Sequence, residues 1–233
     1  MATAVGARDL LARGELTLKG RFRNSSNATF LIEATLDGAS ARAVYKPGRG
    51  ERPLWDFPPD LFKREIAAYV LSEALGWGLV PLTLRRDGPL GDGSLQLFVH
   101  ADFEQHYFTL REDPAHHARL AAICAFDVVA NNADRKAGHC LLADGTIWAI
   151  DNGLCFHVEA KLRTVIWEFA DEPLPPPIVA DLKRLVARPL PPALRDLIAA
   201  EECAVLLKRA RALVKAGRFP SDTVGRGYPW PPV

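Results

Sequence analysis

Apolar and polar residues alternate along three short segments near the start of the chain. Successive side chains of a half-buried β-strand point to opposite faces of the sheet, so this period of two predicts strands. The dipeptide Asp37-Gly38 separates the second segment from the third, as a hairpin turn does. The three predicted strands are Glu15 to Phe22, Ala28 to Leu36 and Ala41 to Lys46.

A helical pattern follows over roughly Asp60 to Leu75. Apolar residues recur there at three- and four-residue spacing, and Gly76 is typical of a helix end. Two more strands are then predicted, Val80 to Arg86 and Ser94 to Val99, joined through the turns Asp87-Gly88 and Gly91-Asp92-Gly93. The predicted order is therefore strand-strand-strand-helix-strand-strand.

The second part of the chain is predicted to be mainly helical. An apolar hairpin, Cys140 to Ile150, turns at Asp144-Gly145, and the segment Leu154 to Pro177 has no regular pattern. The predicted helices begin near Asp113 and continue with Ile178 to Ala187, Ala193 to Ala199 and Cys203 to Ala216. The proline-rich segment Tyr228 to Pro232 is predicted to be an extended surface end.

Composition narrows the possible classes. The chain has 233 residues, of which 48% are hydrophobic and 24% charged, as in ordinary globular proteins. A formal net charge of +1 gives no electrostatic case for binding nucleic acid or an anionic membrane. The four cysteines form no C-x-x-C pair, and no apolar run reaches the roughly 20 residues that span a bilayer. We expect a cytoplasmic protein without stable membrane association.

Two carboxylates flank the predicted hairpin. Asp134 lies before it in Asn132-Ala133-Asp134-Arg135, and Asp151 follows it in Ala149-Ile150-Asp151-Asn152-Gly153. The two ends of a hairpin lie close together, so both carboxylates can face one pocket. A phosphoryl-transfer enzyme requires one carboxylate to accept a hydroxyl proton and another to bind the metal on ATP. Asp134 and Asp151 are therefore the candidates for these two roles.

The amino-terminal part contains the other components of such a site. Lys46 ends a predicted strand and Glu65 lies on the following helix, an order typical of the ion pair that positions nucleotide phosphates in kinases. Ser25 and Ser26 lie between the first two strands, where a loop of small residues can bind phosphates. A plain hairpin turn explains that loop equally well.

Two further features have alternative interpretations. His139 begins the hairpin and either binds the same metal or is a hydrogen-bonded structural residue; as a ligand, its imidazole favours manganese over magnesium. Lys161 and Arg163 follow Asp151 and either bind a substrate or belong to a charged surface loop.

These residues resemble the phosphatidylinositol 3/4-kinase-like superfamily, and within it the type II phosphatidylinositol 4-kinases. The chain also resembles a small actinobacterial group of kinase-like proteins. The likeness extends over roughly Leu16 to Pro175, with the motifs in the family's order. It is carried by Tyr45-Lys46-Pro47, Leu75-Gly76-Trp77-Gly78-Leu79-Val80-Pro81, Ser94-Leu95-Gln96-Leu97-Phe98-Val99 and Ala149-Ile150-Asp151-Asn152-Gly153-Leu154.

The resemblance implies a role for each candidate residue. Lys46 would hold the nucleotide phosphates, Glu65 would orient Lys46, and Ser25 and Ser26 would lie in the phosphate loop. Asp134 would be catalytic and Asp151 would bind the metal. The backbone of the segment that contains Phe98, Val99 and His100 would contact adenine.

The chain departs from that family at two points. The family's second metal ligand is an Asn five positions after the catalytic Asp, and this chain has His139 there. Nothing here corresponds to the cysteine-rich palmitoylation segment of the type II lipid kinases, so an inositol lipid is poorly supported as a substrate.

We therefore predict an α+β, two-lobed protein-kinase-like fold, with a β-rich lobe over residues 1–100 and a helical lobe over residues 101–233. The predicted activity uses ATP with Mg²⁺ or Mn²⁺ to phosphorylate a hydroxyl of a protein or small soluble acceptor. A nucleotide-binding pseudokinase that acts as a scaffold and an AMP transferase are the alternatives.

Overall fold

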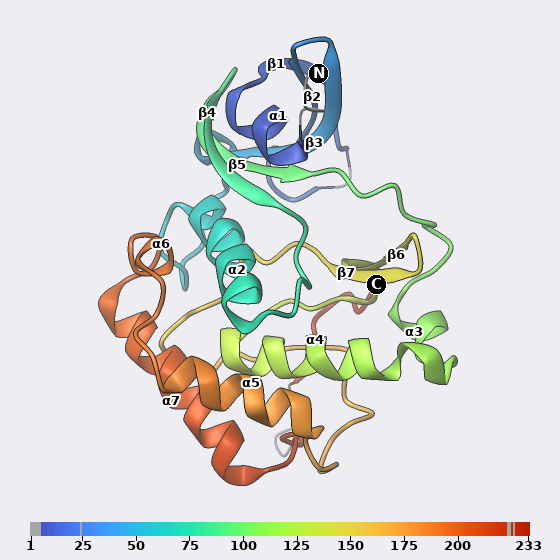
Figure 1. Ribbon diagram of the computed structural model, residues 1–233, viewed down its shortest axis with the longest axis vertical. Helices are drawn as coiled ribbons and strands as arrows, with labels where there is room; N and C mark the ends of the chain where they lie inside the picture. Colours follow the sequence, from blue (N-terminus) through green and yellow to red (C-terminus); the bar gives the residue numbers. More distant parts are fainter. Residues whose placement is uncertain (1–5, 24, 223–224, 226) are drawn as a thin grey trace, which may run out of the picture.

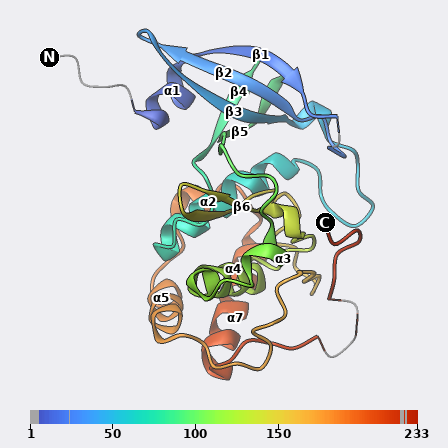
Figure 2. The same cartoon turned by 90° about the vertical axis from the view of Figure 1, so that its right-hand side faces the viewer.

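The computed structural model describes residues 6–23, 25–222, 225 and 227–233. The amino-terminal part is a five-stranded antiparallel sheet in the order β1-β2-β3-β5-β4, and Figure 2 shows most of the helices below it. The predicted α+β arrangement is confirmed. The strands are β1 (Glu15–Arg21), β2 (Phe30–Leu36), β3 (Ala39–Pro47), β4 (Thr83–Gly88) and β5 (Gly91–Leu97).

One helix, α2 (Leu61–Leu75), lies between the sheet and the helical part (Figure 1). It contacts β4 and β5 on one side and α5 and α6 on the other. The remaining helices are α1 (Ala7–Arg13), α3 (Tyr107–Leu110), α4 (His117–Ala130), α5 (Pro176–Val186), α6 (Pro192–Arg195) and α7 (Ala200–Ala216), and the hairpin consists of β6 (Cys140–Ala143) and β7 (Thr146–Ala149).

The buried apolar residues form one large core and two smaller clusters. The large core joins α2 to α4, α5, α7 and the hairpin. A smaller cluster lies between the sheet and α1, where Leu10 and Leu11 pack near Ala43 and Tyr45. Within the described part of the chain, no helix has the length and apolar character needed to cross a membrane.

The predicted turns between β4 and β5 were wrong. Gly88 and Gly93 belong to the strands, Gly88 pairs with Gly91, and only Pro89 and Leu90 connect them. A Cβ at Gly88 would lie 2.8 Å from the Tyr45 ring, and one at Gly93 would lie 2.9 Å from it. These glycines make room for a buried aromatic ring, which cannot be distinguished from turn chemistry in the sequence.

Two helices also differ from the prediction. Helix α1 was not predicted, because seven residues with two buried leucines are too short for a clear periodic pattern. The predicted helix Ala193 to Ala199 ends at Arg195. Ala199 is extended instead, and its backbone N–H donates to the carboxylate of Glu202, 2.9 Å away, which begins the next helix.

The segment 227–233 is more than a free surface end. The carbonyl oxygen of Gly227 accepts hydrogen bonds from Thr164 N (2.7 Å) and Trp167 Nε1 (3.1 Å). The carbonyl oxygen of Pro232 accepts one from Ala137 N at 2.8 Å. Trp230 remains 89% exposed, so the segment is extended as predicted but is bound to the loop around Asp134 by its backbone.

Candidate active site

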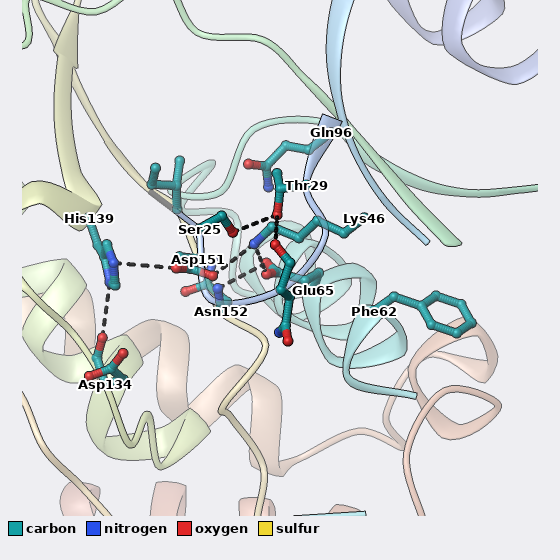
Figure 3. A network of polar contacts seen from close by, with 12 residues as sticks. Ser25, Thr29, Lys46, Phe62, Glu65, Gln96, Asp134, His139, Asp151 and Asn152 are labelled. Carbon is teal, nitrogen blue, oxygen red and sulfur yellow. Dashed lines mark hydrogen bonds and ion pairs between the residues drawn. The ribbon is translucent and has the colours of Figure 1, made fainter. Parts of the chain in front are cut away.

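Lys46 projects from β3 toward the helical part. Along this strand Ala43 and Tyr45 are buried on the side of α1, so Val44 and Lys46 face the opposite side of the sheet. The Lys46 Nζ donates to Glu65 Oε1 and, over 2.8 Å, to Asp151 Oδ1 (Figure 3). The structure thus brings Lys46 into contact with Glu65, 19 positions away in the chain, and with Asp151, 105 positions away.

Glu65 is positioned by the way α2 begins. The Glu51 carboxylate accepts hydrogen bonds from Leu61 N (2.9 Å) and Phe62 N (2.7 Å), which satisfies two of the free N–H groups of the first turn. One turn later Glu65 is 3% exposed, and its Oε2 accepts from Asn152 N at 2.9 Å. Glu65 therefore connects Lys46 to the backbone beside Asp151.

The three groups shift one another's acidity. The positive charge of Lys46 lowers the pKa of Asp151. Burial lowers the pKa of Lys46, but Asp151 and Glu65 outweigh that effect and the pKa lies above its ordinary value. Burial raises the pKa of Glu65, which Lys46 partly offsets. Lys46 is thus charged beside the ionised Asp151, as binding of a phosphate and a cation requires.

A buried ion pair supports the loop between α4 and the hairpin. Arg135 and Asp127 are both fully buried, and the guanidinium lies 3.0 Å from the carboxylate. Arg135 also donates to Ile150 O and Asn152 Oδ1, each over 2.6 Å. It therefore joins the backbone beside Asp134 to the segment around Asp151. Sequence reasoning missed this pair, although a charged Asp127 in the apolar stripe of α4 was a usable signal.

Asp134 lies across a cavity from Lys46. Its backbone N–H donates to Asn132 Oδ1 over 2.9 Å, and its side chain is 32% exposed. Burial raises the pKa of Asp134 to about 6, against the opposing effect of Lys136, whose Nζ lies 3.9 Å from Asp134 Oδ2. A carboxylate of this basicity is well suited to accept a hydroxyl proton.

His139 lies between the two carboxylates (Figure 3). Its Nε2 is 3.4 Å from Asp151 Oδ2, and its Nδ1 is 3.0 Å from the carbonyl oxygen of Asp134. Burial lowers the pKa of His139 to about 4, so the ring is neutral at ordinary pH. Nδ1 also lies 3.3 Å from the backbone nitrogen of Lys136, whose N–H can donate to it. The tautomer that donates from Nδ1 to the Asp134 carbonyl is the one that leaves the Nε2 lone pair on the side of Asp151.

Two adjoining cavities meet at these residues. The first, about 420 Å³, is bordered by Val44, Leu141 and Ile150 and by the predicted adenine-binding residues Phe98 and Val99, whereas His100 lies outside its lining. The second, about 440 Å³, contains Asp134, His139 and Ser26. Residues common to both cavities are Ser25, Thr29, Lys46 and Asp151.

Three apolar residues of the first cavity, Val44, Leu141 and Ile150, were not predicted as site residues. Val44 borders it from the sheet, and Leu141 and Ile150 border it from the hairpin. A flat aromatic ring can bind between such side chains. In the segment predicted to contact adenine, the backbone N–H of Phe98 donates to Arg42 O over 2.9 Å.

Lys161 and Arg163 lie near the same loop. Lys161 Nζ is 3.0 Å from Asp56 Oδ2 and 5.7 Å from the centre of the Phe57 ring. The backbone of Arg163 pairs with the loop around Asp134, because its N–H donates to Asn132 O and its carbonyl accepts from Arg135 N. The Arg163 side chain is exposed.

The described residues fit a metal that is shared with a nucleotide. They include no group of three or more His, Cys, Asp or Glu side chains that could hold an ion alone. Asp151, whose side chain is half exposed, and His139 offer an oxygen and a nitrogen on one cavity. Magnesium and manganese in kinases take such a small protein contribution together with phosphate oxygens and water.

Comparison with known proteins identifies one curated relative. The chain is 43% identical over 260 residues to Protein Rv2133c of Mycobacterium tuberculosis, an alignment that covers 95% of this chain and 94% of that protein. No family model matches the chain. The alignment therefore covers nearly all of both proteins.

Three solved structures, two of them named as kinases, resemble the chain in fold. The Golgi casein kinase with Mn/ADP bound matches with a TM-score of 0.59 and 15% identity, over 97% of this chain and 79% of that one. Hydra Fam20 with sugar matches with a TM-score of 0.51 and 14% identity, over 89% of this chain and 86% of that one. The Helicobacter pylori proinflammatory kinase CtkA matches with a TM-score of 0.51 and 12% identity, over 89% of this chain and 94% of that one. The predicted kinase-like fold is confirmed. The closer likeness to type II phosphatidylinositol 4-kinases stays a prediction, as does the lobe boundary at residue 100.

Proposed function

The chain belongs to the family of Mycobacterium tuberculosis Protein Rv2133c, and we propose that it is a metal-dependent kinase that transfers the γ-phosphoryl group of ATP to a hydroxyl. The observation that carries the proposal is the contact of Lys46 Nζ with both Glu65 and Asp151, with Asp134 on the same cavity. A charged amine that is already oriented, next to an exposed carboxylate, favours binding of nucleotide phosphates and their metal.

Each side chain has a defined task in the reaction. Lys46 binds the phosphates and remains oriented by Glu65. Asp134 accepts the proton of the acceptor hydroxyl. The hydroxyl oxygen forms the new P–O bond to the γ-phosphorus, and the bond between that phosphorus and the β-phosphate oxygen of ADP breaks. Asp151 and His139 would hold Mg²⁺ or Mn²⁺, which offsets negative charge on the phosphates. The adenine ring would lie between Val44 and the hairpin residues Leu141 and Ile150.

The acceptor is a protein side chain or a small soluble alcohol. The second cavity, where Asp134 lies, is also bordered by Arg52 and Leu54, so both charged and apolar groups are near the attacking hydroxyl. We place the reaction in the cytoplasm, because all four cysteines are buried free thiols.

Labelled ATP tests the proposal directly. Wild-type protein with Mg²⁺ or Mn²⁺ is compared with Asp134→Asn, which removes the base while keeping the size of the side chain. We expect γ-label to be transferred or released by wild type and the rate to fall at least about a hundredfold in the variant. Asp144→Asn is the matched control, because Asp144 lies in the hairpin turn with φ of 48°, a conformation that Asn tolerates.

The same experiment separates the alternatives. Transfer of α-label instead of γ-label would identify an AMP transferase. Nucleotide binding without turnover of either label would identify a scaffold and contradict the proposal. His139 at the second metal position is the observation that keeps the scaffold as a second candidate, since imidazole is an unusual partner for Mg²⁺.

A further inference from the structure

Helix α2 is held on two sides by consecutive residues. Glu65 bonds to Lys46 and to Asn152 N at the nucleotide site. Arg64 precedes it and bonds to the helical part of the molecule. Consecutive residues of a helix differ in direction by about 100°, so the two side chains can serve different surroundings. The kinase proposal uses Glu65 but gives Arg64 no task.

Arg64 is buried, although burial of a charged side chain is unfavourable unless it is paired. The residue is 3% exposed, and its Nη2 lies 2.5 Å from Glu202 Oε1 on α7. Its Nη1 donates to the carbonyl oxygen of Cys155, four residues after Asp151. The guanidinium also lies 5.5 Å from the centre of the Phe57 ring. Arg64 thus joins α2 to α7 and to the segment that contains Asp151.

Glu202 is itself fixed in place. It is 7% exposed, and its second oxygen, Oε2, accepts the backbone N–H of Ala199 at the start of α7. Outward movement of α2 would separate Arg64 from Glu202 and leave two buried charges without partners. Such a separation is strongly unfavourable, so the position of α2 shown here is the preferred one.

We propose that Arg64 is a positioning residue, whose bonds to Glu202 and Cys155 hold α2 where Glu65 orients Lys46, so that the site requires no activating partner or modification. This inference rests on the proposed kinase function. It makes α2 a fixed part of the helical body and not a movable regulatory element. Glu65 then meets Lys46 before any nucleotide binds.

Three variants and one control test the inference. Arg64→Met removes the charge but keeps a long apolar stem, Arg64→Lys keeps the charge without the forked geometry, and Glu202→Gln weakens the pair from the other side. Arg184→Met is the control, because Arg184 Nη2 donates to Leu75 O at the far end of α2 over 2.7 Å. It removes an arginine bond to the same helix away from Glu65.

The first measurement is release of γ-labelled phosphate from ATP and Mn²⁺ by unmodified protein. We expect activity without a lag in wild type, and a kcat lowered at least about tenfold in Arg64→Met, since small displacements of a positioning group cost that much or more. Arg64→Lys and Glu202→Gln should be intermediate, and Arg184→Met should remain within about twofold of wild type when each variant is assayed well below its own Tm. Equal kcat in Arg64→Met and the control, or activity only after prior phosphorylation, would overturn the inference.

Hydrogen exchange gives a second readout that does not depend on activity. In Arg64→Met we expect faster exchange of the amides along α2 around Glu65, whereas Arg184→Met should affect only its last turn. Unchanged protection around Glu65 would overturn the positioning role even if kcat falls. Absence of any turnover in wild type would instead contradict the kinase proposal, and the exchange result would still decide whether Arg64 fixes the helix.

Discussion

Individual charged residues define this site through partners that are distant in the chain. Asp127 is fully buried in α4 and faces Arg135, which in turn reaches Asn152 next to Asp151. Lys46 shows the same principle at the cavity surface, where Glu65 and Asp151 bind it from different elements. The active-site geometry therefore depends on buried ion pairs as much as on the residues that would contact substrate.

Substitution of Asp127 by alanine should strongly destabilise the protein. It would leave the fully buried guanidinium of Arg135 without its carboxylate, a loss of about 3–5 kcal/mol in the free energy of unfolding. Urea denaturation measures this difference. Asp92→Ala is the control, because it removes a solvent-exposed pair with Arg85 and should cost about 1 kcal/mol or less. Similar losses in both variants would show that the Arg135 pair does not support the fold.

His139→Asn should change the preference between metals. The neutral imidazole contributes a nitrogen beside Asp151, whereas the amide of Asn contributes an oxygen, the donor that Mg²⁺ prefers. We expect the ratio of kcat/KM with Mn²⁺ to that with Mg²⁺ to fall in the variant. His157→Asn serves as the control, because the Nδ1 of His157 accepts a bond from Glu159 N and this residue does not border either cavity. An unchanged ratio in His139→Asn would exclude His139 as a ligand.

At the scale of elements, the alternating segments and the apolar hairpin were predictable from local patterns. The order of the strands within the sheet could not be read from local patterns, because β3 pairs with β5 and α2 lies between them in the chain. Helix α1 and the true β4–β5 turn were missed, since short helices and glycines inside strands give weak local signals. In the site, Lys46, Glu65 and Asp151 lie in contact, as their order along the chain suggested. The partners of the buried residues Arg64 and Asp127 could not be identified, because they are set by tertiary packing and not by sequence spacing.

The pairing of β3 with β5 also fixes the position of the Lys46 backbone beside the cavity. Gly93 pairs with Pro47, and a Cβ at Gly93 would lie 2.5 Å from the carbonyl oxygen of Lys46 and 2.8 Å from Pro47 Cα. Gly93→Ala must therefore displace the backbone of β3. We expect weaker ATP binding, measured by calorimetry, together with a lower Tm.

The control for this change is in the same sheet. A Cβ at Gly20 in β1 has nothing within 4 Å, so Gly20→Ala should leave ATP affinity unchanged. If Gly93→Ala binds ATP as tightly as Gly20→Ala, the register of β5 does not determine the position of Lys46.

At the scale of the whole molecule, the sheet and the helical part both border the first cavity, where we propose that the nucleotide binds. Val44 and Lys46 come from the sheet, whereas Leu141, Ile150 and Asp151 come from the hairpin and the segment after it. A ligand that contacts both walls binds the native state and not the unfolded chain, so it must raise the free energy of unfolding of the entire protein. Stability therefore reports on nucleotide binding even when the acceptor is unknown.

Thermal unfolding should detect this effect. With MnADP at a concentration of about one hundred times its Kd, we expect a gain of roughly 2.7 kcal/mol and a corresponding rise in Tm. Lys46→Met should abolish most of the rise, because it removes the positive charge that binds the phosphates in the proposed arrangement. It also leaves the carboxylates of Glu65 and Asp151 near the ligand without their positive partner. Lys19→Met, on the exposed pair with Glu33 in the same sheet, should retain the full rise. An equal rise in both variants would place the nucleotide elsewhere and contradict the convergence of Lys46, Glu65 and Asp151 as its binding site.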